Sequence, residues 1–188
     1  MVHIGEARGV ATVALITAMD RPLGHAIGNA LETREAIDCL HGRGPADLRE
    51  LVLAEAVEML RCARTVGGEA EADEPPGAHT RAEGHTYLDA YKRAEAALAS
   101  GAALERFRQM VAAQQGDVAL VDDPTRIPQA SHVVEVAAEC EGIVSEVHPR
   151  QLGEAVVALG GGRTKLGDGI DLSVGFEVFV RPGDAVQS

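Results

Sequence analysis

The point where an extended apolar run gives way to a helical pattern constrains this chain more than any other feature. Residues Val10–Thr17 (VATVALIT) form a short β-branched run, which is typical of a buried strand in a parallel or mixed sheet. A glycine-containing turn follows at Pro22–Glu32, and apolar residues recur at helical spacing from about Gly24 to Leu40. Because the end of such a strand can leave backbone groups free, the turn is where a ligand site is expected.

Further helical stretches follow this strand, turn and helix. Apolar residues at helical spacing predict helices from Asp47 to Leu60, from Tyr87 to Ala99 and over Leu104–Val111. The intervening segment 67–84 (GGEAEADEPPGAHTRAEG) has almost no large apolar residue, so it is predicted to be an acidic, solvated loop. A strand followed by helices indicates an α/β arrangement.

After residue 130 the periodicity changes from helical to strand-like. Short apolar runs at 132–136, 142–147 and 174–180 predict strands, and a helix is expected around Leu152–Leu159. The last residues predict a turn and the start of one more strand, so the sheet of this module is expected to lack a member. The predicted fold class is α/β, or α+β by segregation, with a partial mixed sheet and flanking helices before a small strand-rich module. The predicted segments are 1–66 (strand plus two helices), 67–84 (acidic loop), 85–130 (helices of the same domain) and 131–188 (C-terminal module, truncated at its end).

Composition and charge argue against several functions. The chain has 188 residues, with 17 Lys and Arg against 29 Asp and Glu, and its net charge of −12 opposes binding to nucleic acid. The cysteines, Cys39, Cys62 and Cys140, lie far apart without CxxC spacing, so neither a disulfide framework nor a zinc site is expected. The N-terminal residues show no basic segment followed by an apolar one, and no apolar run approaches a membrane span, so we expect a cytoplasmic protein without a membrane partner.

Three blocks of sequence stand out in their order and spacing. They are ALITAMDRPLGHAIGNALETREAIDCLHGRGPADLRELVLAEAVEML at 14–60, ASGAALERFRQMVAAQQGD at 99–117 and GIVSEVHPRQLGEAVVALGGGRTKLGDGIDLSVGFEVFVRPGD at 142–184. Together they resemble the thymidine and pyrimidine-nucleoside phosphorylases over nearly the whole chain, except for the acidic loop. The resemblance implies a homodimeric enzyme with a helical domain, a larger α/β domain and a C-terminal module of barrel-sandwich fold, of which this chain is the later part.

The reaction that the resemblance implies is reversible phosphorolysis, in which a pyrimidine nucleoside and phosphate give the free base and a pentose 1-phosphate. In the family, a loop rich in glycine and serine and preceded by Lys-His holds phosphate, and an Arg, a Ser and a Lys hold the pyrimidine. These residues lie upstream of the segment matched by Val10, and none has a counterpart here. Because phosphorolysis needs oriented donors and cations at the sugar and at the leaving base, we expect the chain alone to be inactive. No catalytic or cofactor-binding residue is assigned to it.

The resemblance carries one site over to this chain residue by residue. Family members bind a potassium-like cation beside the phosphate loop, through two carbonyls of the PLGxA turn and a Glu nine residues after its Ala. The matching positions are Leu23, Ala26 and Glu35. A hard cation prefers several oxygen ligands, and a glycine-flanked turn can present free carbonyls. Three ligands are too few for a full shell, so an incomplete K⁺ site is expected. Without the resemblance, two packing residues and a solvated helical charge would be the simpler interpretation.

Several residues near this turn, and one glycine-rich segment, need a separate interpretation. Ala18 stands where the family usually has Asp, and Arg21 where it usually has Gln, so a carboxylate is lost and a cation added beside the active-site cleft that the resemblance implies between the helical and the α/β domains. His25 has no identifiable carboxylate partner and is interpreted as a turn residue. The segment 160–165 (GGGRTK) lacks the terminal Gly-Lys-Ser/Thr of a Walker motif, so its two basic residues are expected to be structural or surface charges.

Three hypotheses of different classes remain open. The first is the C-terminal part of a pyrimidine-nucleoside phosphorylase, active only when an N-terminal half is supplied, with a complementing subunit or a homo-oligomer as possible partners. The second is a non-catalytic remnant that binds a protein through an exposed sheet edge. The third is a carrier module, because the strand-rich part resembles biotinyl and lipoyl domains in outline. Lys165, however, lacks the Met or Asp flanks that are common in those domains.

Overall fold

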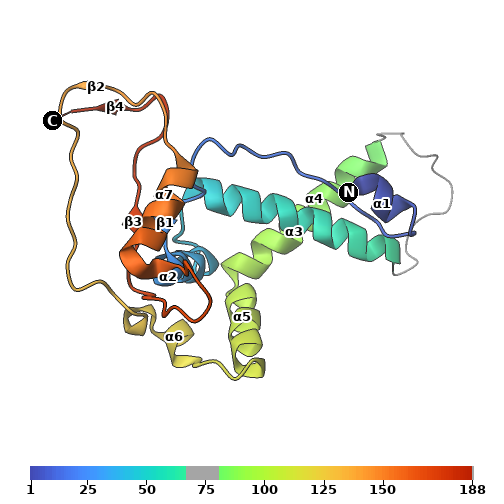
Figure 1. The fold of residues 1–188 in the computed structure, drawn as a ribbon. Helices are drawn as coiled ribbons and strands as arrows, with labels where there is room; N and C mark the ends of the chain where they lie inside the picture. The colour runs from blue at the N-terminus through green and yellow to red at the C-terminus, as the bar shows by residue number, and fades with distance from the viewer. Residues whose placement is uncertain (67–80, 188) are drawn as a thin grey trace.

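Helices form most of the regular structure, and short strands join segments that are far apart in the sequence. A computed structural model describes residues 1–66 and 81–187. Figure 1 shows the helices extending from left of centre to the right, and two short strands at the upper left, near the C-terminus. In chain order the elements are α1 (Val2–Glu6), β1 (Ala26–Ile27), α2 (Asn29–Leu40), α3 (Ala46–Val66), α4 (Arg81–Ala99), α5 (Ala102–Ala113), α6 (Ala119–Asp122), the 3₁₀ turn η1 (Pro124–Arg126), β2 (Gly142–Ile143), α7 (Pro149–Val156), the π-helical turn η2 (Val157–Gly161), β3 (Phe176–Glu177) and β4 (Ala185–Val186).

The two longest helices, α3 and α4, pack against each other (Figure 1). Leu53 and Val57 lie one turn apart on α3 and are buried, as are Ala90 and Ala94 on α4. This spacing gives each helix one apolar face, and the small alanines allow close approach of the two backbones. Burying a side chain such as Val57, which is 0% exposed, contributes about 1.5–3 kcal/mol.

A second cluster of buried residues connects α2 to the segment after α6. Ala30 and Ile37 of α2 and Ile127 are buried together, and partly buried side chains of α5 and α6 pack against them. Those surrounding residues are Leu104, Phe107 and Leu120. Since Ile37 and Ile127 are ninety residues apart, this cluster fixes the position of the α5–α6 segment relative to α2.

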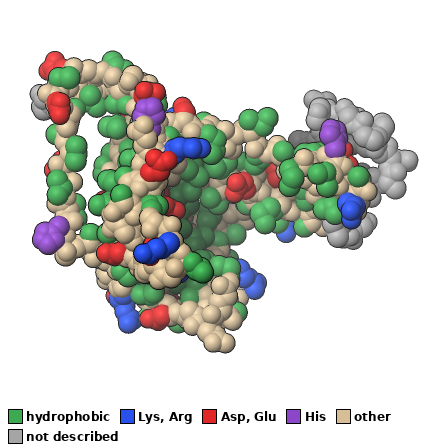
Figure 2. All heavy atoms as spheres, viewed as in Figure 1, with side chains coloured by type: hydrophobic (Ala, Val, Ile, Leu, Met, Phe, Trp, Pro, Cys, Tyr) green, Lys and Arg blue, Asp and Glu red, His purple; other side chains and the backbone are tan. Residues whose placement is uncertain are grey.

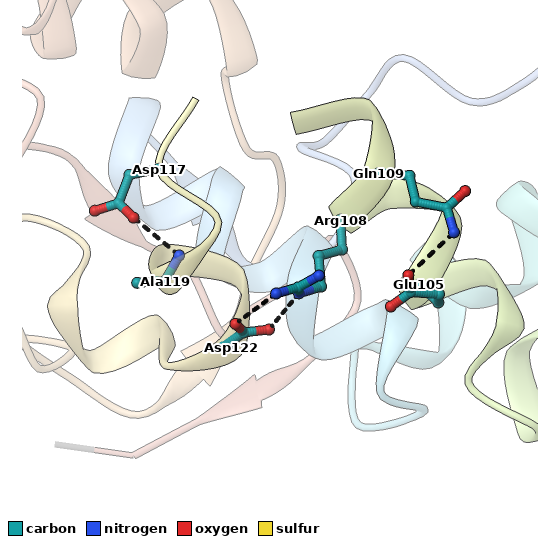
Figure 3. Close-up of polar contacts among 6 residues, drawn as sticks. All are labelled: Glu105, Arg108, Gln109, Asp117, Ala119 and Asp122. Carbon is teal, nitrogen blue, oxygen red and sulfur yellow. Dashed lines mark hydrogen bonds and ion pairs between the residues drawn. The ribbon is translucent and has the colours of Figure 1, made fainter. Parts of the chain in front are cut away.

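Polar contacts hold α5 and α6 together at the surface (Figure 3). Arg108 of α5 donates from Nε to Oδ1 of Asp122 on α6, at 2.9 Å. The carboxylate of Asp117 accepts a hydrogen bond from the backbone N–H of Ala119, at 2.9 Å, at the start of α6. Both groups of contacts are exposed, so they orient the short helix but contribute little to stability.

Two antiparallel sheets of two strands each are present among the described residues. Strand β1 pairs with β3, with Ala26 opposite Glu177, whereas β2 pairs with β4. The β1–β3 pair crosses the boundary predicted near residue 131, so the C-terminal segment is attached directly to the turn before α2. The predicted mixed sheet is wrong for the described structure, in which both strand pairs are antiparallel.

All four predicted strands are absent or much shorter in the structure. Residues 10–17 and 132–136 form no strand, the run predicted at 142–147 is a strand only at Gly142–Ile143, and the run predicted at 174–180 is one only at Phe176–Glu177. The valines at 133, 134 and 136 are exposed, and Figure 2 shows hydrophobic side chains along the loop at the left edge of the molecule. A strand requires hydrogen bonds from a neighbouring strand, and the described residues supply none at 10–17 or 132–136. Composition alone therefore overestimated the strand content.

The helices predicted from apolar periodicity are present, with shifted ends. The first begins at Asn29 instead of Gly24, because Gly24 and Gly28 have φ angles of 70° and 134°, which a helix does not accommodate. Helix α4 begins at Arg81, so it includes the last four residues of the loop predicted at 67–84. Residues 67–80 of that loop lie outside the described residues. The helix expected around Leu152–Leu159 is divided between α7 and η2.

The sequence predicts no membrane-spanning segment. None of the helices in the described ranges combines the length and the apolar character needed to cross a bilayer.

Candidate functional site

Two of the three residues predicted to bind a cation, Ala26 and Glu35, are in contact at the turn before α2, whereas Leu23 lies earlier on the same turn with its side chain 44% exposed. Glu35, on the second turn of α2, directs its carboxylate back toward the segment Leu23–Ala26. Its Oε1 accepts hydrogen bonds from the backbone N–H of His25, at 2.9 Å, and of Ala26, at 3.2 Å. A Cβ on Gly24 would overlap this carboxylate, so glycine is required there for space as well as for its φ of 70°. Ala26 and Glu35, nine residues apart in the sequence, are therefore in direct contact.

The C-terminal segment holds this turn from the opposite side. The carbonyl of His25 accepts a hydrogen bond from the N–H of Val178, at 2.8 Å, next to the pair formed by Ala26 and Glu177. The imidazole ring of His25 lies 5.2 Å from the ring of Phe179, measured between centroids, with the planes tilted by 54°. This packing supports the interpretation of His25 as a turn residue, because its ring contacts an aromatic side chain.

The start of α2 is attached to the C-terminal segment by further hydrogen bonds. Asn29 donates from Nδ2 to the carbonyl of Gly161, at 3.0 Å, and the N–H of Ala30 donates to the carbonyl of Leu172, at 3.1 Å. Within the helix, Glu32 accepts from the N–H of Gly28, at 2.9 Å. The bonds of Gly28 and Ala30 satisfy backbone N–H groups that have no partner inside the helix at its N-terminus, and Asn29 adds a bond from its side-chain amide. The geometry of the turn therefore depends on residues more than 130 positions later in the chain.

A cavity of about 360 Å³ opens beside the turn. Arg34 is one of the residues of its wall, and Nη2 of this arginine is buried and has no hydrogen-bond partner within the described ranges. Charged groups of both signs face it, including Asp38, which forms an ion pair with Arg43 at 2.7 Å. The cavity is lined by His25, Ala26, Leu31, Arg34, Glu35, Asp38, Arg43, Gly44, Pro45, Glu177 and Phe179.

The donor chemistry at the turn fits a hard monovalent cation in part. A carboxylate and backbone carbonyls are oxygen ligands, which K⁺ and similar ions accept. One oxygen of Glu35 already accepts two backbone N–H groups, which leaves its other oxygen, Oε2, facing Gly24. In the part of the chain that the structure describes, no group of three or more His, Cys, Asp or Glu side chains could hold a metal ion. A cation at this turn would therefore depend on main-chain carbonyls for most of its ligands.

The glycine-rich segment 160–165 runs into a loop that is closed by hydrogen bonds to the carboxylate of Asp168. Asp168 accepts hydrogen bonds from the hydroxyl of Thr164, at 2.7 Å, and from the backbone N–H of Lys165, at 3.0 Å. These bonds lower the pKa of the Asp168 carboxyl, the Thr164 hydroxyl having the largest effect. Because an acidic side chain accepts the N–H groups of this loop, the loop does not resemble a phosphate cradle.

Sequence reasoning missed the residues that connect the turn to the C-terminal segment. Asn29 and Arg34 carried no motif, and the ion pair of Asp47 with Arg181, at 3.1 Å, joins positions 134 residues apart. Asn29 offered one signal in the sequence, because an asparagine at the start of a helix often forms a hydrogen bond to a backbone group.

Comparisons with known proteins agree with the resemblance found in the sequence. Residues 143–188 match the family described as the pyrimidine nucleoside phosphorylase C-terminal domain. Over 187 residues, covering the whole chain, the sequence is 41% identical to the pyrimidine-nucleoside phosphorylase of Bacillus subtilis (strain 168) and 40% identical to that of Geobacillus stearothermophilus. The enzyme of the same name from Staphylococcus haemolyticus (strain JCSC1435) is also 40% identical. The chain spans 39% of the length of each of these relatives.

These matches confirm the resemblance predicted from the three sequence blocks. The chain is similar, along its whole length, to the C-terminal part of pyrimidine-nucleoside phosphorylases.

Proposed function

We propose that this chain is the C-terminal part of a pyrimidine-nucleoside phosphorylase, a pentosyltransferase. The reaction converts a pyrimidine nucleoside and phosphate to the free base and a ribose or deoxyribose 1-phosphate. The observation that carries this proposal is the match of the entire chain, at 40–41% identity, to enzymes of which it spans 39%. We propose that the phosphate-binding and base-binding groups come from the part of the enzyme that corresponds to the rest of those relatives. The active form is then a complex with a complementing N-terminal portion, and it assembles as a homo-oligomer.

In this proposal, the chain contributes a positioned turn beside the reacting groups. As the glycosidic bond breaks, positive charge develops on the sugar and negative charge on the leaving base, so fixed charges and dipoles near both ends lower the barrier. The turn is fixed from two sides, by the Glu35 carboxylate and by the strand pair between Ala26 and Glu177. Fixed groups of this kind need no reorganisation during the reaction.

We also propose that the turn supplies part of a K⁺ site, through Leu23, Ala26 and Glu35. A bound K⁺ would add positive charge next to the co-substrate phosphate. The proximity of the Glu35 carboxylate to the turn supports this assignment, because an oxygen of that side chain lies within hydrogen-bond distance of Ala26. The other ligands would come from the N-terminal portion. We also propose that the protein is cytoplasmic and does not bind nucleic acid.

A full-length chimera tests the proposed function. The N-terminal portion of the Bacillus subtilis enzyme, up to the residue that matches the start of this chain, is joined in frame to residues 1–188. We expect phosphate-dependent release of uracil from uridine or of thymine from thymidine, followed by ultraviolet absorbance. The chain alone should release no base, and the intact Bacillus subtilis enzyme is the positive control. A folded chimera that releases no base from either nucleoside would refute the proposal.

The cation assignment is tested separately in the same chimera. Activity should rise with K⁺ and remain low when K⁺ is replaced by the larger tetramethylammonium ion. Glu35→Gln keeps an oxygen acceptor for the two N–H groups but removes the charge, so it should raise the K⁺ concentration needed for half-maximal activity. An unchanged K⁺ dependence in this variant would argue that Glu35 only shapes the turn.

A further inference from the structure

The C-terminal segment runs alongside the turn and the start of α2. Strand β3 and the turn η2 of this segment lie beside β1 and the first residue of α2 (Figure 1). At one end of the contact, the N–H of Val178 donates to the carbonyl of His25, at 2.8 Å. At the other end, Nδ2 of Asn29 donates to the carbonyl of Gly161, at 3.0 Å, across 132 residues of sequence. A main-chain bond therefore fixes one end of the contact, and a side-chain amide fixes the other.

Two glycines lie where the backbones of the turn and of the C-terminal segment meet. A Cβ on Gly28 would overlap the carbonyl of Val174, and a Cβ on Gly175 would overlap the carbonyl of Ile27. Because no side chain separates the two backbones here, neither of them can be displaced without moving the other. A shift of the C-terminal segment is therefore transmitted directly to the main chain of the turn.

The pairing of β1 with β3 determines where the carbonyl of Ala26 points. Residues of an antiparallel pair alternate between hydrogen-bonded and non-hydrogen-bonded positions. The carbonyl of His25 accepts the N–H of Val178, so Ala26 has the non-hydrogen-bonded position and its main-chain groups point away from β3. Its N–H donates to Glu35, at 3.2 Å, which agrees with this direction. The Ala26 carbonyl is therefore directed to the side on which the Glu35 carboxylate lies.

The bond of Asn29 to Gly161 connects this geometry to the C-terminal segment. Gly161 is buried at the end of η2, and Asn29 is the first residue of α2, three positions after Ala26. Without the amide, the Gly161 carbonyl loses this donor, and the start of α2 can shift relative to the C-terminal segment. The peptide that carries the Ala26 carbonyl would move with it, because α2 follows β1 after a single residue.

We infer that Asn29 is a positioning residue for the cation turn, Leu23–Ala26. Its bond to Gly161 keeps β1 in place on β3 and thereby holds the Ala26 carbonyl in the direction that a cation requires. This inference rests on the proposed function and on its K⁺ site. The Asn29 amide is directed at Gly161, so it acts on the cation only through the turn. Its loss should weaken K⁺ binding and leave turnover of the K⁺-saturated enzyme unchanged.

The chimera with the Bacillus subtilis N-terminal portion tests this inference in two variants. Asn29→Ala removes the amide, and Gln129→Ala removes a matched amide that donates to the carbonyl of Thr125, at 3.1 Å. K⁺ is varied against tetramethylammonium at constant ionic strength. If the turn holds the binding geometry for only part of the time, affinity falls by that fraction, so Asn29→Ala should need at least about tenfold more K⁺ for half-maximal activity. Gln129→Ala should need the same K⁺ concentration as the unsubstituted chimera.

Thermal unfolding provides a readout that does not depend on activity. A cation that binds the folded chimera raises its unfolding temperature, and the K⁺ concentration at which the rise begins reports affinity. This concentration should increase in Asn29→Ala and stay constant in Gln129→Ala. Asn29→Gln keeps an amide donor and should recover part of the affinity. A role confined to general stability would lower the unfolding temperature equally at every K⁺ concentration, and that result would overturn the inference.

Hydrogen exchange of residues 1–188 alone tests the positioning of the turn directly. The amides of His25 and Ala26, which donate to Glu35, should lose at least about tenfold of their protection in Asn29→Ala, because the turn then opens more easily. The amides of α3 should keep theirs, and Gln129→Ala should change neither group. Asn29→Ser, whose side chain is shorter but suits the start of a helix, replaces the Ala variant if that variant does not fold.

The outcomes separate this inference from the proposed function. A chimera whose stabilisation by K⁺ weakens in Asn29→Ala, but which releases no base, would refute the function and leave the positioning role standing. An active chimera in which Asn29→Ala and Gln129→Ala need the same K⁺ concentration would overturn the positioning role. An active chimera that responds to K⁺ in neither readout would also overturn it. If the chimera does not fold, exchange in the chain alone decides, and equal protection of His25 and Ala26 in the two variants would overturn the inference.

Discussion

The α3–α4 helix pair and segment 10–19 contain similar apolar residues, yet only the helix pair is folded onto a partner within the chain. Each helix makes its main-chain hydrogen bonds internally, so it needs from its neighbour only an apolar face, such as that of Leu53 and Val57. Segment 10–19 would need another strand for the same purpose, and the described residues provide none. The helix pair therefore finds its partner within the chain, whereas segment 10–19 has no strand partner among the described residues.

The largest expected effect comes from comparing the same substitution in the two kinds of environment. Ile37 is 1% exposed, and Ile37→Ala should reduce the free energy of unfolding by about 2–5 kcal/mol, through lost burial and a cavity. Ile16→Ala, at a fully exposed position, should change it by less than about 0.5 kcal/mol. Urea unfolding followed by circular dichroism measures both. If Ile16→Ala is as harmful as Ile37→Ala, segment 10–19 is packed within the chain and the contrast fails.

The turn at Leu23–Ala26 lies between segment 10–19 and the helices. Substitutions of Glu35 show how much its hydrogen bonds stabilise this turn. Glu35→Ala removes the acceptor for the N–H groups of His25 and Ala26, so it should cost about 1.5–3 kcal/mol of the free energy of unfolding. Glu35→Gln retains an acceptor oxygen and should recover part of that loss. Glu55→Ala, on the exposed surface of α3, is a control in which little change is expected. An equal loss in the Gln and Ala variants would show that charge, not hydrogen bonding, stabilises the turn.

The contact between α3 and the C-terminal segment should be weaker. Arg181 and Asp47 form an ion pair at 3.1 Å, with their side chains 39% and 17% exposed. A double-mutant cycle with Arg181→Ala and Asp47→Ala should give a coupling energy of about 0.2–1 kcal/mol, reduced by added salt. A coupling energy of zero would mean that the C-terminal segment is attached without this ion pair, by the β1–β3 pair and the hydrogen bonds of Asn29 and Ala30.

The smallest effect is expected at the loop that Asp168 closes. This loop has no regular secondary structure, and the Asp168 carboxylate accepts the hydrogen bonds of its N–H groups. Hydrogen bonds from Thr164 and Lys165 lower the pKa of Asp168 below its ordinary value of 3.8. A group whose pKa is lowered by folding stabilises the folded form above its unfolded pKa, and this contribution is lost as the pH falls through the lowered value. The protection of the amides of residues 164–165, measured against the exchange of an unstructured peptide at the same pH, should therefore fall only below about pH 4. In Asp168→Asn this loss of protection should be absent, and its persistence would assign it to another group.

The sequence predicted well those features that are local. Apolar spacing located α2, α3 and α5, because a helix repeats its pattern within its own residues. It failed for the run at 10–17, because β-branched composition describes a strand's preference but does not supply its partner. The contact of Glu35 with the turn followed from the family pattern, whereas the pairing of β1 with β3 left no local signal in either segment.

The pairing of β1 with β3 also has a consequence for synthesis on the ribosome. Glu177 is made about 150 residues after its partner Ala26. At typical elongation rates this delay is roughly 8–30 s, during which α2 and the α3–α4 pair can fold but the turn has only one of its two supports. An mRNA truncated before the codon for Phe176 would therefore yield a protein with folded helices and a turn that lacks its β3 partner. Proteases would cleave that exposed turn more readily than the helices.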